Sequence, residues 1–165
     1  MSAGNVNAQL ELSFVGMGIQ KVAQIVKIAN FTDGGGAAGT LTLSKQIPAG
    51  SFVLGSKVTV KTGFTGDTTA VMDIGDGSDE DLFSYTTHNV YAAAENLVEG
   101  CDSAAAGNTG TGIVPVGTAK NVVLTVTGGS DFGLITAGEM LVEVFYLSTN
   151  IELSNGYPRR VALSL

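Results

Sequence analysis

Residue types that often carry catalysis or cross-linking are scarce in this 165-residue sequence, which has no Trp and one residue each of Cys and His. Because Cys101 is alone, no disulfide can form within the chain. Because His88 is alone, Cys/His zinc sites and proton relays that need two imidazoles are excluded. The absence of Trp and of an aromatic surface for sugars also disfavours a glycosidase. Few residue types are therefore left for a catalytic site.

Charged residues are also few, at 14%, and acids dominate them, which gives a net charge of -7. Binding to phosphate backbones needs a basic patch, so we expect no nucleic-acid partner. The sequence has no apolar run of the roughly 18 residues that span a bilayer and no signal-peptide pattern, so we expect no membrane partner. Mean hydropathy is nevertheless +0.31, and a subunit interface is the usual place for such an apolar surplus. This surplus predicts a homo-oligomer.

Alternation of apolar and polar residues, the pattern of half-buried strands, recurs along the chain. Residues 57–61 place valines on one side and lysines on the other, and residues 121–127 repeat this pattern. Residues 140–147 are apolar on both faces except at Glu143, as expected of a central or interface strand. Further strands are predicted at 6–14, 22–29, 40–44, 70–74 and 83–87. We therefore predict an all-β fold, an antiparallel β-sandwich.

Glycine-rich turns separate the predicted strands, and only residues 91–99, with their alanines, have the composition of a helix. The fold should therefore contain at most one short helix. The chain length corresponds to one domain. We divide the chain into an extended N-terminal arm at 1–20, which is able to pair with a neighbour, a β-sandwich at 21–150 and a C-terminal tail at 151–165.

Two glycine-containing segments have the composition of ligand-binding loops. Residues 34–39 match the spacing G-x-G-x-x-G, but a strand pattern follows where a dinucleotide site needs a helix, so we predict a hairpin loop. Residues 73–81 are rich in acids, and clustered carboxylates bind Ca²⁺. The weak metal candidates are Asp73, Asp76, Asp79 and Asp81. Because Gly75 occupies the position of the second acid of an EF-hand, a solvated acidic turn is favoured, and we expect no metal and no cofactor.

The remaining polar residues do not form a recognisable catalytic set. A Ser-His-Asp triad through His88 is formally possible, but no G-x-S-x-G elbow is present to expose a serine. We expect His88 to end a strand and to form local hydrogen bonds. Cys101 has no basic neighbour in the sequence that would lower the pKa of its thiol. Glu95 and Glu99 are four residues apart on the predicted helix, a common spacing on solvated faces. We therefore predict that the protein is not an enzyme.

Three segments resemble stretches found in phage virion proteins. They are residues 47–54 (IPAGSFVL) followed by 58–60, residues 69–77 (TAVMDIGDG) and residues 135–146 (ITAGEMLVEVFY). Over about residues 45–147 the chain is similar to the phage capsid decoration, or cement, proteins. The resemblance implies a jelly-roll type of sandwich, commonly a homotrimer, that is synthesised in the host cytoplasm and stabilises the capsid surface of the virion by binding the phage major capsid protein. Head- and tail-fibre knobs share such bodies, so a receptor- or glycan-binding knob is the alternative.

The segments that flank the predicted sandwich supply candidate interface residues. These candidates are Leu10, Leu12, Phe14, Arg159, Arg160 and Leu163. The three N-terminal candidates alternate with polar residues, so an arm could add a strand to the sheet edge of a neighbour. The two arginines are the only ones in the chain, and Arg is favoured at interfaces because it binds carboxylates bidentately. An equal alternative is that both arginines keep a frayed tail soluble.

Overall fold

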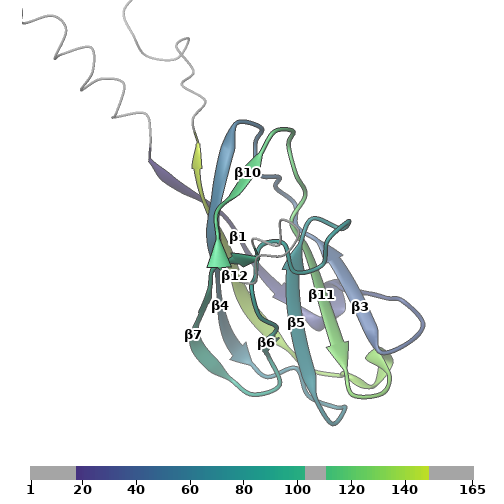
Figure 1. Cartoon of the computed structure of the whole chain (residues 1–165). Coiled ribbons are helices and arrows are strands. Elements are labelled where there is room, and N and C mark those ends of the chain that lie inside the picture. The colour runs from purple at the N-terminus through teal and green to yellow at the C-terminus, as the bar shows by residue number, and fades with distance from the viewer. Residues whose placement is uncertain (1–17, 103–110, 149–165) are drawn as a thin grey trace, which may run out of the picture.

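Two antiparallel β-sheets packed face to face form the body of the protein (Figure 1). The structure, a computed structural model, describes residues 18–102 and 111–148. Sheet A has the order β1 (Ile19–Lys27), β12 (Glu139–Ser148), β4 (Ser51–Thr62) and β10 (Val114–Val116), and β7 (Ala94–Glu99) also pairs with β4. Sheet B has the order β2 (Thr32–Asp33), β3 (Ala38–Thr42), β11 (Val123–Gly128), β5 (Ala70–Gly75) and β6 (His88–Asn89). The predicted all-β antiparallel sandwich is confirmed.

The remaining regular elements are small. A separate two-stranded ribbon pairs β8 (Cys101–Asp102) with β9 (Thr111–Gly112). The helical elements of the described ranges are two 3₁₀ turns, η1 (Ile28–Asn30) and η2 (Phe132–Leu134). Neither is an α-helix, and none of the described residues forms a helix long and apolar enough to cross a membrane.

The interior lies between the two sheets and is filled by alternate residues of each strand. Sheet A contributes, among others, Val22, Val26, Val58, Val60, Met140, Val142 and Val144, and sheet B contributes Met72, Ile74, Leu124 and Val126. Burial of each such side chain stabilises the fold by about 1.5–3 kcal/mol relative to its exposure. The period-two pattern of the sequence therefore has a direct cause, because one side of every long strand faces this interior.

Most predicted strands occur close to their expected positions. The valines of residues 57–61 point inward from β4, and β12 is a central strand between β1 and β4, as residues 140–147 predicted. The glycine-rich residues 34–39 belong to a hairpin in which β2 pairs with β3, and the Gly34 N–H donates to the Ala38 carbonyl at 3.1 Å. The hairpin prediction is confirmed.

The predicted helix at residues 91–99 is wrong, because this segment contains strand β7. Leu97 lies opposite Val58 and Glu99 lies opposite Ser56 in an antiparallel pairing with β4. A helix of this length gains too few hydrogen bonds to be stable by itself, whereas the strand extends a sheet that already exists. The pairing with β4 outweighs the weak helical preference of the alanines.

The predicted strand at residues 83–87 is also wrong. Phe83 is buried and its N–H donates to the Ile74 carbonyl at 2.8 Å, but residues 84–87 have no regular structure, and β6 begins at His88. The Tyr85 N–H donates to the carbonyl of Gly100 at 2.7 Å, so the segment bridges two parts of the fold. The buried aromatic ring anchors an irregular connection here.

The two ends of the described sandwich lie side by side. Ile19, at the start of β1, pairs with Leu147, close to the end of β12 (Figure 1). The chain therefore enters and leaves the sandwich at one corner of sheet A. Most of the predicted arm at 1–20 and all of the predicted tail at 151–165 lie outside the described residues.

Candidate docking surface

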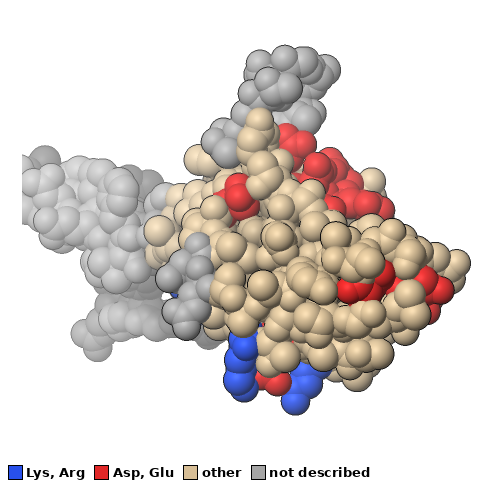
Figure 2. Space-filling view, turned by 90° about the horizontal axis from the view of Figure 1, so that it is seen from below, with Lys and Arg blue, Asp and Glu red and all other residues tan. Residues whose placement is uncertain are grey.

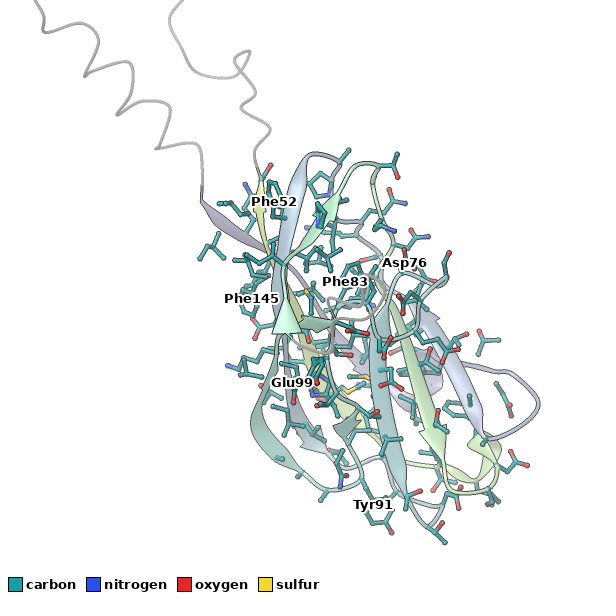
Figure 3. All side chains as sticks on the ribbon, viewed as in Figure 1. Phe52, Asp76, Phe83, Tyr91, Glu99 and Phe145 are labelled. Carbon is teal, nitrogen blue, oxygen red and sulfur yellow. The ribbon has the colours of Figure 1, made fainter. Side chains whose placement is uncertain are left out.

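Sheet A has one side on the interior and one side that no other described element covers. We call this second side the outer face. It is formed by the outward side chains of Ile19, Lys21, Ala23, Ile25 and Lys27 from β1, Phe52, Lys57, Thr59 and Lys61 from β4, Val98 from β7, and Glu139, Leu141, Glu143, Phe145 and Leu147 from β12. Figure 3 shows Phe52 and Phe145 projecting from sheet A on the side away from Phe83, which lies in the interior.

The outer face leaves large apolar side chains in water. Ile25 is 64% exposed and Val98 is 65% exposed, and Ile19 and Phe52 are also exposed. Phe145 is half-buried and lies near Ile19 and Val98 on this face. Single exposed apolar residues are common on protein surfaces, but a group gathered on one sheet face is typical of an interaction site.

Two hollows lie on the same face. One has a volume of about 610 Å³ and is lined by residues that include Ile25, Leu141 and Lys61. The other has a volume of about 240 Å³ and is lined by residues that include Val98 and Phe145. The first hollow has Lys61 and Glu139 beside its apolar walls, whereas the second is almost wholly apolar, with Glu99 as the one charged residue in its lining. Such hollows suit side chains inserted from a partner protein.

The charged groups of the outer face form ion pairs across neighbouring strands. The Lys21 ammonium donates to the Glu143 carboxylate at 2.5 Å. The Glu139 carboxylate accepts from Lys61 at 2.7 Å and lies 3.5 Å from Lys27. The hydrogen bond from Lys61 is the main cause that holds the pKa of Glu139 below its usual value. Glu139 is therefore ionised at neutral pH, and the two lysines beside it partly neutralise its charge.

The four acidic residues considered for metal binding point to different partners. Asp76 accepts hydrogen bonds from the Lys120 ammonium and from the backbone N–H groups of Ser78 and Asp79. Partial burial opposes ionisation of Asp76, but the bonds from Lys120 and the backbone together hold its pKa below the usual value. Asp76 is thus already neutralised by a lysine, which leaves it poorly suited to a cation.

The other three candidates do not converge on Asp76. Asp73 lies on β5, and partial burial is the main cause that raises its pKa. Asp79 is hydrogen-bonded to Asp81, and this bond raises the pKa of Asp81. Within residues 18–102 and 111–148, no group of three or more His, Cys, Asp or Glu side chains is arranged to hold a metal ion.

The two residues singled out for nucleophilic chemistry are both buried. Cys101 lies with its sulfur 3.6 Å from the carbonyl oxygen of Val53, and burial raises the pKa of its thiol to about 11. His88 is 3% exposed, and its Nε2 atom has no hydrogen-bond partner within the described residues. The expectation that His88 ends a strand is wrong, because it begins β6. Neither group is accessible to a substrate.

Burial of His88 predicts a specific dependence of stability on pH. Burial lowers the pKa of the imidazole below 6.5, and the charge of Glu99 opposes this only in part. The unfolded chain therefore binds a proton that the folded chain rejects, so stability falls as the pH drops below about 6.5. We expect the melting temperature to fall between pH 7 and 5 by a few degrees more in the unchanged protein than in His88→Gln. Parallel pH profiles of the two melting temperatures would contradict this.

The predicted interface residues Leu10, Leu12, Phe14, Arg159, Arg160 and Leu163 lie outside the described residues.

Comparison with protein families and with curated proteins finds no match. Among solved structures, the chain is similar to one described as "Cyanophage Pam1 capsid asymmetric unit", with 15% sequence identity and a TM-score of 0.44. The match covers 81% of this chain and 86% of that chain.

Sequence reasoning assigned no role to the outer face, although its signal was present in part. The lysines of residues 57–61 were placed on the side opposite the valines, and Glu143 was the exception in its apolar strand. The sequence does not reveal the order of the strands in the sheet. Lys21, Glu143 and Lys57 become neighbours only because β12 lies between β1 and β4.

Proposed function

We propose that this protein is a non-enzymatic structural component of a phage virion that binds the assembled capsid surface and stabilises it. The observation that carries the proposal is the outer face of sheet A, where exposed apolar side chains, hollows and charged groups lie together. Burial of such a face against another protein removes apolar area from water at about 25 cal/mol per Å². The resemblance of about residues 45–147 to decoration proteins supplies the class of partner, the phage major capsid protein.

The mechanism follows from mass action. A protein that binds the assembled shell but not the separated subunits raises the free energy needed to open the shell. At a free concentration of 100 times Kd, this amounts to about 2.7 kcal/mol for each occupied site. A homotrimer with a jelly-roll body, as the family resemblance implies, would multiply this effect, because its subunits are linked and bind neighbouring sites together.

The test uses heads of the phage that encodes the chain, stripped of this protein. We expect the purified protein to sediment with the heads in a saturable way and to raise the temperature at which they release DNA. Its mass in solution should be roughly 50 kDa, three times the mass of one chain. Heads that neither bind the protein nor become more heat-resistant would overturn the proposed function.

A binding screen against cells and glycans separates the proposed function from a receptor-binding knob. Exposed aromatic side chains on loops are the features that a sugar site would use, and Tyr85 and Tyr91 are partly exposed in turns. We expect no binding to cells or glycans. Retention on cells without retention on heads would favour the knob.

The N-terminal arm is tested by a truncation. Deletion of residues 1–17 leaves β1 complete, because this strand begins at Ile19. If the arm pairs with a neighbour, the truncated protein should melt as a sandwich with little change but should protect heads less. Equal occupancy and equal heat resistance would contradict a role for the arm.

A further inference from the structure

Positive charge is concentrated on one side of a chain whose net charge is -7. Among the side chains that the structure describes, four lysines, Lys21, Lys27, Lys57 and Lys61, lie on the outer face, against two glutamates on the same face and Glu99 at its margin. The described acids otherwise lie mainly in turns and on sheet B. Figure 2 shows this separation, with lysines gathered on one side of the molecule and most acidic side chains on the others.

The glutamates on the outer face do not neutralise the charge of all four lysines. Lys21 is paired with Glu143, and Lys27 and Lys61 share the single carboxylate of Glu139. Lys57 forms no ion pair within the described residues, although Glu143 is its partner in the strand register. The face therefore keeps a positive excess around its apolar centre.

A second copy of this chain does not complement the outer face. Two outer faces packed against each other would bring lysines together, which is unfavourable. The acidic turn at 76–81 has the opposite charge, but its sequence, Asp-Gly-Ser-Asp-Glu-Asp, contains no apolar side chain to fill the hollows beside Ile25 and Val98. The complementary surface should therefore combine an apolar centre with acidic groups around it, a combination that neither the outer face nor the acidic turn of a second copy offers.

We propose that the outer face of sheet A is the surface that seats this protein on the capsid, and that its counterpart is an apolar patch bordered by Asp and Glu side chains. This inference rests on the proposed function and adds to it the orientation of the protein and the chemistry of the partner. Charge complementarity of this kind increases the association rate and sets the register of docking. The apolar centre supplies the larger share of the affinity.

The experiment measures binding to stripped heads for variants that change charge without disturbing the fold. The double variant Lys57→Glu with Lys61→Glu reverses two charges, and the ion pair that it removes contributes little to folding, because the Lys61 side chain is largely exposed. The matched control is Lys45→Glu, because Lys45 is exposed in the connection between β3 and β4 and lies off the outer face. Val98→Asp tests the apolar centre. Melting temperatures confirm that each variant is folded.

We expect the double variant to bind heads about 100-fold more weakly, with about tenfold for each reversed contact. Val98→Asp should also bind more weakly, Lys45→Glu should bind within about twofold of the unchanged protein, and added salt should weaken the unchanged protein. Equal binding of all variants would overturn the inference alone. Tighter binding of the double variant would show that the partner surface is basic. A variant that loses the homotrimer mass but still binds heads would show that the outer face is a subunit interface. Either result would also overturn the inference. If heads do not bind the unchanged protein, the proposed function fails as well.

Discussion

Replacement of Phe64 by alanine is expected to lower the free energy of unfolding by about 3–5 kcal/mol. The Phe64 ring is 0% exposed and packs edge-on against Phe31, with the ring centroids 6.0 Å apart. On another side the backbone of Gly138 approaches the ring so closely that a Cβ at that position would lie 2.5 Å from it. Because rigid backbone and a second ring surround the site, it cannot collapse to fill the space that alanine leaves.

Chemical denaturation measures this effect, and Phe52→Ala is the matched control. Phe52 is 42% exposed on the outer face, so its truncation should cost less than about 1 kcal/mol. Since domains of this size are stable by about 5–15 kcal/mol, the Phe64 variant would lose a large part of its stability. Similar losses for both variants would contradict the tight packing of the buried Phe64 ring against Phe31 and Gly138.

The fold was predictable from sequence where the strands have one buried side and one exposed side. Val122, Leu124 and Val126 alternate in the sequence, and all three are buried between the sheets. The prediction failed where local composition competes with pairing between distant segments. The alanines before Glu99 favour a helix locally, but the edge of β4 was available to pair with them, and no local pattern contains that information.

The outer face could not be predicted for a related reason. Each of its strands shows only an alternation, and the role of the outward residues depends on which strand lies beside it. Lys61 and Glu139 are 78 residues apart in the sequence and 2.7 Å apart in the structure. The acidic segment at 73–81 shows the reverse case. Its composition is typical of a cation site, but pairing of Asp76 with Lys120 explains part of its charge without a ligand.

Replacement of Gly55 by alanine is expected to destabilise the fold by at least about 2 kcal/mol and to disturb the outer face as well. Gly55 has φ of +146°, a conformation that favours glycine, and a Cβ there would lie 2.3 Å from the backbone carbonyl oxygen of Glu99. The register between β4 and β12 shifts beside it, so Gly55 permits the irregularity that lets β7 approach β4 closely.

Alanine at position 55 therefore requires β7 to move, and the adjacent Val98 moves with it. Gly117→Ala is the control, because nothing lies within 4 Å of a Cβ at that position. Denaturation should show a loss only for the Gly55 variant, and its binding to stripped heads should weaken at temperatures where it is still folded. Unchanged stability of Gly55→Ala would contradict the close packing of β7 on β4. A stability loss without any loss of head binding would instead place Val98 outside the docking surface, because the strand that carries it would have moved without effect on the partner.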